Sequence, residues 1–287
     1  MTDMKILSQL DADLAQTVQG TDILGAIVPI NYASEKQRFF ASLCASNPVF
    51  EYEKPAVDSF SKKRALFNLP IDALGDDDLA HLYSDVIGSY VDKLDQIHAI
   101  GTPEFRYNSL RYFGEPSDKD IRNAQFILHL PNQAEENEEI FTADAMAEQL
   151  TEFAQQHGYA FQARIEDSMI ANALVNGTTL KINRNAQVSA TELRALAHHE
   201  LGVHLATTLN ARSQPLKVMS LGCPLNTLTQ EGLAILCEYL SGCLTLPRLK
   251  VLALRVLAVN SMIHEKDFCR TFAMLKDDHG ASDELAF

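Results

Sequence analysis

The residues with the clearest chemical potential stand together in the segment AHHELGVH, residues 197–204. Imidazole nitrogens and carboxylate oxygens are common zinc ligands, and a carboxylate beside such ligands can act as a general base. His199 and His204 are five residues apart, and Glu200 follows the first of them, in the pattern HExxxH. We therefore take His199 and His204 as candidate zinc ligands and Glu200 as the candidate base.

The spacing of the two histidines makes a demand on the helix that carries them. On a regular α-helix, side chains five residues apart are rotated by about 140° from one another, so these imidazoles could not share one ion. A π-helical turn absorbs one extra residue and restores the alignment. Gly202 lies inside the required turn and would tolerate the distortion. The spacing thus predicts a widened turn around residues 201–203.

A catalytic zinc ion needs three protein ligands and one open position, so a third ligand is required. Glu231 is the best candidate, because it stands in the segment TQEGLA (residues 229–234) at the start of the next long helix. Glu238, seven residues further on, is the rival. It is better suited to accept the second ring N–H of a ligand imidazole. His198 is expected on the helix surface or behind the ligands. We expect one zinc ion per chain.

The elements around this segment are readable from pattern and turn residues. Apolar residues at helical spacing predict helices at 77–94, 118–130, 143–157, 189–209, 229–241 and 249–263. Ser189 and Glu192 have the spacing of a capping box at a helix start. The pair Asn176-Gly177, flanked by apolar residues, predicts a hairpin and hence a small antiparallel sheet. In peptidases an edge strand before the zinc helix can pair with an extended peptide.

These elements predict an α+β, mostly helical fold. We expect a helical N-terminal region at residues 1–130 and a zincin-like metallopeptidase region at residues 131–287, with the small antiparallel sheet and the HExxxH helix. The acidic, proline-initiated stretch at 131–141 is the expected boundary, because four glutamates there favour a solvated loop.

The composition limits the partners. The chain has 287 residues and a formal net charge of −14, so it repels phosphate backbones and anionic membranes, and no nucleic-acid or membrane partner is expected. Five cysteines without a CxxC pair indicate free thiols in a reducing compartment. The N-terminus lacks the pattern of a signal peptide, and no apolar run reaches the roughly 18 residues of a membrane span. A cytoplasmic enzyme is the prediction.

The segment HHELGVH followed by TQEGLA resembles the QEGLA-motif family. Its bacterial members are described as modulators of flavohaemoglobin expression, and its eukaryotic members are microtubule-associated tyrosine carboxypeptidases. The resemblance includes Asn210, residues 214–216 and 238–242, and more loosely residues 31–32 and 101–105. It implies that HExxxH supplies two ligands and the base and that the QEGLA glutamate supplies the third ligand. Family members continue past the point where this chain stops, so the resemblance also implies a missing C-terminal segment.

A carboxypeptidase must bind a free carboxylate, for which an arginine is well suited. Arg255 is the first candidate for this substrate contact and Arg212 the second. An ion pair between Arg255 and a buried carboxylate such as Glu238 is an equally consistent reading. Tyr239 could stabilise an oxyanion, but a core tyrosine is the simpler interpretation.

The sequence therefore predicts a zinc-dependent peptidase. We expect a metallocarboxypeptidase that hydrolyses a C-terminal peptide bond of a peptide or protein with Glu200 as general base. Two alternatives stay open at this point. One is a non-catalytic regulatory or binding protein whose metal site is structural or vestigial. The other is a metal-dependent hydrolase that acts on a non-peptide amide.

Overall fold

The computed structural model describes residues 4–21, 23, 25–131, 138–167, 169–221 and 226–287. The chain forms two compact units, each built from three separate segments. The first unit takes residues 1–21, 58–91 and 135–244, and the second takes residues 22–57, 92–134 and 245–287. The units interleave along the sequence, and the division between residues 130 and 131 stays a prediction.

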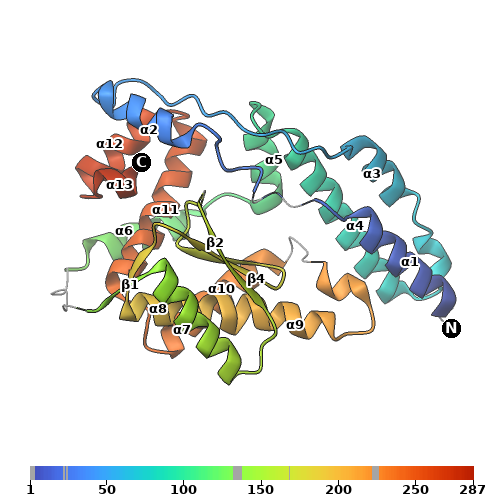
Figure 1. Cartoon of the computed structure of the whole chain (residues 1–287). Coiled ribbons are helices and arrows are strands. Elements are labelled where there is room, and N and C mark those ends of the chain that lie inside the picture. Colours follow the sequence, from blue (N-terminus) through green and yellow to red (C-terminus); the bar gives the residue numbers. More distant parts are fainter. Residues whose placement is uncertain (1–3, 22, 24, 132–137, 168, 222–225) are drawn as a thin grey trace. The chain divides into compact units, whose positions relative to one another are not determined.

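The first unit contains the described strands and the histidine-rich segment (Figure 1). Its elements in chain order are α1 (Met4–Thr17), α3 (Ser59–Phe67), η1 (Ile71–Leu74), most of α4 (Asp77–His98), β1 (Ile140–Thr142), α7 (Ala143–Gln156), β2 (Gln162–Glu166), β3 (Ala173–Asn176), β4 (Thr179–Asn183), β5 (Gln187–Ser189), α8 (Ala190–Leu196), η2 (Ala197–Leu205), α9 (Ala206–Arg212), η3 (Lys217–Ser220) and α10 (Thr227–Leu240).

The strands form two small sheets. Strands β1 and β5 pair antiparallel, and the other sheet has the order β2-β4-β3, which leaves β3 at an edge. Strands β3 and β4 form the expected antiparallel hairpin, but β2 runs parallel to β4. The prediction of an antiparallel sheet was therefore wrong for β2, because β3, which follows β2 in the chain, lies on the other side of β4 and runs antiparallel to it, so that β2 and β4 run in the same direction.

The hairpin turn differs by one residue from the expected pair. Asn176 still belongs to β3 and pairs with Thr179, so the loop is Gly177-Thr178. Only the glycine takes a positive φ, of 62°, as a type II′ turn requires at its first central position.

The core of this unit lies between the three-stranded sheet and the helices that pack on it (Figure 1). Helix α7 contributes Met146 and Leu150, strand β4 contributes Leu180 and Ile182, and η2 contributes Leu201, all almost fully buried. The histidine-rich segment is therefore anchored by its apolar face, which leaves its other face to carry polar groups.

Local signals for the helix starts and ends were read correctly. Ser189 accepts a hydrogen bond from the Glu192 N–H, and the Glu192 carboxylate accepts one from the Ser189 N–H. Gly158 follows α7 with φ of 68°, as expected of a glycine after a helix end. The predicted helices at 77–94 and 118–130 appear as α4 and α6, each within a few residues of the expected bounds.

The second unit is helical in its described part. It contains α2 (Tyr32–Ala41), α5 (Glu104–Phe113), α6 (Asp118–His129), α11 (Leu246–His264), α12 (Phe268–Ala273), η5 (Met274–Asp278) and α13 (Asp283–Ala286). Phe39, Leu254 and Phe272 form the centre of an aromatic-rich core. The last helix predicted from the sequence is the one at 249–263. The short helices after it were not predicted, because elements of four to six residues carry too little periodicity.

Membrane-spanning helices, cysteines and the acidic stretch can be compared with the predictions within the described residues. Within the described ranges, no helix is both long and apolar enough to cross a membrane. Cys44, Cys237, Cys243 and Cys269 are free thiols, and Cys223 lies outside the described residues. Most of the acidic stretch at 131–141 also lies outside them.

A buried carboxylate ties the first helix to a segment two hundred residues away. Asp11 of α1 accepts the Tyr83 hydroxyl at 2.8 Å and the backbone N–H groups of Lys217 and Val218 at 2.7 and 2.8 Å. It thereby caps the first turn of η3. Burial, and then the Asp11 carboxylate, raise the pKa of Tyr83, so this phenol stays a donor.

We predict that Asp11→Ala lowers the free energy of unfolding by about 2–4 kcal/mol, because three donors, two of them buried, lose their acceptor. Urea denaturation followed by circular dichroism measures this. Asp13→Ala, two residues along the same helix, is the control and should cost about 1 kcal/mol or less. Equal losses in the two variants would contradict the assignment of Asp11 as an anchor.

Candidate metal centre

The segment that carries the histidines is a π-helix. It runs over Ala197–Leu205, between α8 and α9, and the N–H of Ala206 bonds the carbonyl of Leu201, five residues back. The predicted widening is confirmed, and it extends beyond the single turn expected around residues 201–203. A Cβ at Gly202 would make only an ordinary contact of 3.8 Å with the Ala197 carbonyl, so a glycine is not required there sterically.

The π-helical register brings the two imidazoles face to edge. The ring centroids of His199 and His204 are 5.0 Å apart, with an interplanar angle of 68°. At a spacing of five residues on an α-helix they would point in different directions. On η2 both rings lie on the same side, so their Nε2 atoms can approach one ion.

Glu231 completes a cluster of three donors. It lies in the first turns of α10, and its two carboxylate oxygens lie 3.7 Å from the His199 Nε2 and 3.6 Å from the His204 Nε2. One ligand atom from each residue can be chosen so that all lie within 4.8 Å of one another. Tetrahedral zinc with bonds near 2.0–2.1 Å separates its ligands by about 3.3 Å. Two imidazoles and one carboxylate, with a fourth position open, therefore fit a zinc ion.

Glu238 holds His199 from behind. Its side chain is almost fully buried, and its Oε1 lies 2.7 Å from the Nδ1 of His199. A carboxylate at that nitrogen keeps the proton on Nδ1 and leaves Nε2 free to face Glu231. Because Glu231 and Glu238 lie two turns apart on α10, a single helix supplies both the third donor and the support of the first.

Glu200 lies beside the cluster with its two oxygens directed differently. Its Oε1 is 4.0 Å from the Nε2 of His199. Its Oε2 accepts the backbone N–H of Val175, in strand β3, at 2.8 Å. The residue is only 7% exposed. One oxygen is thus tied to the sheet, and the other faces the candidate metal ligands.

The electrostatics of the cluster favour a cation. Burial lowers the pKa of His199, but Glu231, Glu238 and Glu200 outweigh it and raise this pKa to about 9. Burial lowers the pKa of His204, with the charge of Glu231 opposing it. Three carboxylates therefore surround two imidazoles, an excess of negative charge that a divalent cation would balance in place of a proton.

The other residues singled out from the sequence lie further from the cluster or in the second unit. His198 points away from the ligands and packs edge-on against Phe153 of α7, at 5.4 Å between centroids. Burial lowers its pKa. Tyr239 is 65% exposed, so its interpretation as a core tyrosine was wrong.

The two candidate arginines lie in different units. Arg212, at the end of α9, donates to the Thr178 hydroxyl in the hairpin turn at 3.2 Å. Arg255 lies on α11 in the second unit, whereas the cluster belongs to the first. A substrate contact through either arginine stays a prediction.

The contribution of Val175 to the site was not predicted from the sequence. Its contribution is a backbone N–H, which carries no signal in the residue type. The hairpin register was the one feature that could have indicated it. At alternate positions of an edge strand the N–H does not bond the neighbouring strand and points outward instead. The sequence also gave no sign of Gln230, whose side chain acts to raise the pKa of His204.

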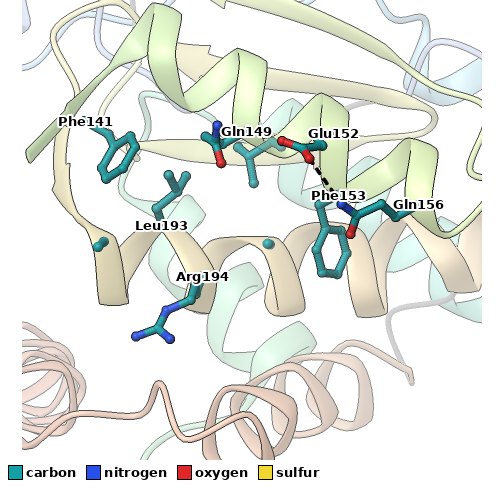
Figure 2. A pocket seen from close by; sticks show the side chains of 10 residues that line it. Phe141, Gln149, Glu152, Phe153, Gln156, Leu193 and Arg194 are labelled. Carbon is teal, nitrogen blue, oxygen red and sulfur yellow. Dashed lines mark hydrogen bonds between the residues drawn. The ribbon is translucent and has the colours of Figure 1, made fainter. Parts of the chain in front are cut away.

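A separate pocket lies between α7 and α8 (Figure 2). Phe141, Leu150, Phe153 and Leu193 give it apolar walls, and Arg194 lies at its margin. Among the described residues that line it, Ala197 comes closest in sequence to the cluster, and none is a cluster residue. This pocket is therefore distinct from the candidate metal centre.

We predict about one zinc ion per wild-type chain and its loss in His204→Ala and in Glu231→Ala, because each change leaves only two of the three donors. Elemental mass spectrometry of the purified proteins measures the zinc content. His198→Ala, which removes the neighbouring histidine, should keep the metal. Loss of zinc from that control to the same degree would refute the assignment of the donor set.

We also predict that Glu238→Gln weakens zinc binding by about 10- to 100-fold, since an amide holds the His199 ring less firmly than a carboxylate does. Competition with a chromogenic chelator gives the dissociation constant. Glu152→Gln, on α7, is a matched control that should leave it unchanged. An unaltered affinity in Glu238→Gln would mean that its contact with His199 is only structural.

Comparison with known proteins places the chain in a family. The family model for the microtubule-associated tyrosine carboxypeptidase matches residues 37–287, which include the HExxxH segment, Glu231 and Glu238. No curated protein matches the chain significantly. The family match covers most of the sequence, and the chain therefore belongs to the microtubule-associated tyrosine carboxypeptidase family.

Proposed function

We propose that this protein is a zinc-dependent carboxypeptidase that hydrolyses the C-terminal peptide bond of a peptide or protein. The observation that carries the proposal is the group of His199, His204 and Glu231, whose donor atoms lie within 4.8 Å of one another, with the carboxylate of Glu200 beside it. Membership of a carboxypeptidase family supports the same reaction class.

The roles follow from the chemistry of each group. Zinc bound by the two imidazoles and Glu231 would supply Lewis-acid chemistry, which polarises a carbonyl and acidifies water. Glu200 would take the proton from the attacking water through the oxygen that faces the cluster and pass it to the leaving amine. Glu238 would hold the His199 ring in one tautomer throughout. The open side of Glu231, whose side chain is 57% exposed, would leave room for substrate.

The substrate would be an extended chain end. Strand β3 is an edge strand of its sheet and contacts η2, so a peptide in extended conformation could pair with edge groups of β3 other than the Val175 N–H, which Glu200 accepts. Arg212 and Arg255 are the candidates for binding the terminal carboxylate. The net charge of −14 disfavours a strongly acidic tail, so we do not extend the proposal to tubulin.

The test uses zinc-loaded protein and a library of peptides that differ in the last residue, tyrosine included. We predict release of the last amino acid, detected by mass spectrometry, from peptides with a free C-terminus but not from the same peptides as C-terminal amides. Glu200→Gln should retain its zinc and lose about 10²- to 10⁴-fold in kcat, since the base is removed but the donors are intact.

Three other outcomes would each contradict a part of this proposal. Zinc-loaded wild type that cleaves none of the peptides would favour a structural metal site in a regulatory or binding protein. Equal cleavage of free and amidated peptides would indicate endopeptidase action. Activity that survives in Glu200→Gln would remove Glu200 from the mechanism.

A further inference from the structure

The candidate base, Glu200, is held by a contact from strand β3. The backbone N–H of Val175 donates a hydrogen bond to the Glu200 carboxylate at 2.8 Å. Val175 lies in β3, in the middle of the hairpin that ends at Gly177-Thr178. Val175 and Glu200 are 25 residues apart, so this contact exists only because the hairpin packs on η2.

The register of the hairpin explains why this N–H is available. Asn172 and Asn183 pair through a backbone hydrogen bond of 2.9 Å, and Val175 stands opposite Leu180. In an antiparallel pair, hydrogen-bonded and non-hydrogen-bonded positions alternate, so Val175 occupies a non-hydrogen-bonded position. Its N–H therefore points out of the sheet edge, towards Glu200, and takes no part in holding β3 to β4.

The hydrogen bond from Val175 determines which oxygen of the Glu200 carboxylate faces the candidate metal ligands. With Oε2 bound to the Val175 N–H, Oε1 is the oxygen directed at the His199 Nε2, 4.0 Å away. A general base must keep its proton-accepting atom within hydrogen-bond reach of the water it activates, and misplacement by about 1 Å costs rate. Without the hydrogen bond from Val175, the Glu200 carboxylate would have more orientations open to it.

The turn of the hairpin is tied down in its own right. Arg212 at the end of α9 donates to the Thr178 hydroxyl, and a Cβ placed on Gly177 would lie 3.2 Å from the Arg212 Nη2. Helix α9 continues directly from η2, which carries Glu200. The arginine therefore fastens the strand to the same continuous helical segment that carries the base.

We propose that Val175 is a positioning residue of the reaction: its backbone N–H orients the Glu200 carboxylate, and Arg212 secures the turn that brings it there. This inference rests on the proposed function for its effect on rate. It gives Arg212 the role of securing the hairpin turn. It also predicts that the Val175 N–H, already bonded to Glu200, is not available to a peptide strand that adds to the edge of β3.

The test removes the backbone N–H of residue 175. Val175→Pro removes this donor at an outward-facing edge position, where proline does not break the β3–β4 ladder. We expect kcat to fall about tenfold or more, as for loss of a hydrogen bond to a charged group, with KM within about threefold and the zinc content unchanged. Val175→Ala keeps the N–H and is the control, expected to retain most of the wild-type kcat. A second variant carries the α-hydroxy acid analogue of valine at position 175, which exchanges N–H for an ester oxygen and serves if the proline variant does not fold.

A readout without turnover separates this inference from the proposed function. In wild type we expect slow hydrogen exchange at the Val175 amide, and exchange at least tenfold faster in Glu200→Ala, measured by NMR with the Leu180 amide as internal reference. Unchanged exchange in Glu200→Ala, or a folded Val175→Pro or ester variant with wild-type kcat, would overturn the assignment. Inactive wild type with the expected exchange would refute only the proposed function.

Discussion

The candidate site depends on one feature of backbone geometry, the π-helical register of Ala197–Leu205. It places His199 and His204 on the same side of a helix although their spacing is wrong for an α-helix. A π-helix makes poorer hydrogen bonds and is rare, so it persists only where its surroundings stabilise it. Here Leu201, Val203 and Leu205 are buried within the same nine residues, and packing against the sheet supplies that support.

The polar side of this segment concentrates charge that is costly to bury. Glu200 and Glu238 are largely removed from solvent, and each would pay a desolvation penalty as an isolated ion. The imidazoles offset part of it, which is why the pKa of His199 rises to about 9 despite its burial. A cation at the three donors would offset it further. Such a cluster makes little sense as a stabilising core, since well-packed apolar side chains would serve that purpose as well.

The supports of the cluster come from distant parts of the chain. Glu231 and Glu238 arrive on α10, Val175 arrives on β3, and the segment before α10 is fixed to α1 by the buried Asp11. Each of these contacts orients a different polar group. Rigid placement of this kind is what a metal-dependent reaction requires, because the donors and the base must meet within fractions of an ångström.

The sequence by itself indicated the three candidate donors and the local structure that their spacing needs. The five-residue spacing, the capping box at Ser189 and the glutamate at 231 were sufficient for this, because helical rotation and the coordination number of zinc are local or chemical constraints. Only the tertiary structure decided which groups support the donors and how the sheet is built. The parallel pairing of β2, the N–H of Val175 and the anchoring by Asp11 depend on backbone groups and on pairs 17 to 207 residues apart. Backbone donors are the same in every non-proline residue, so no residue type reveals them before the chain is folded.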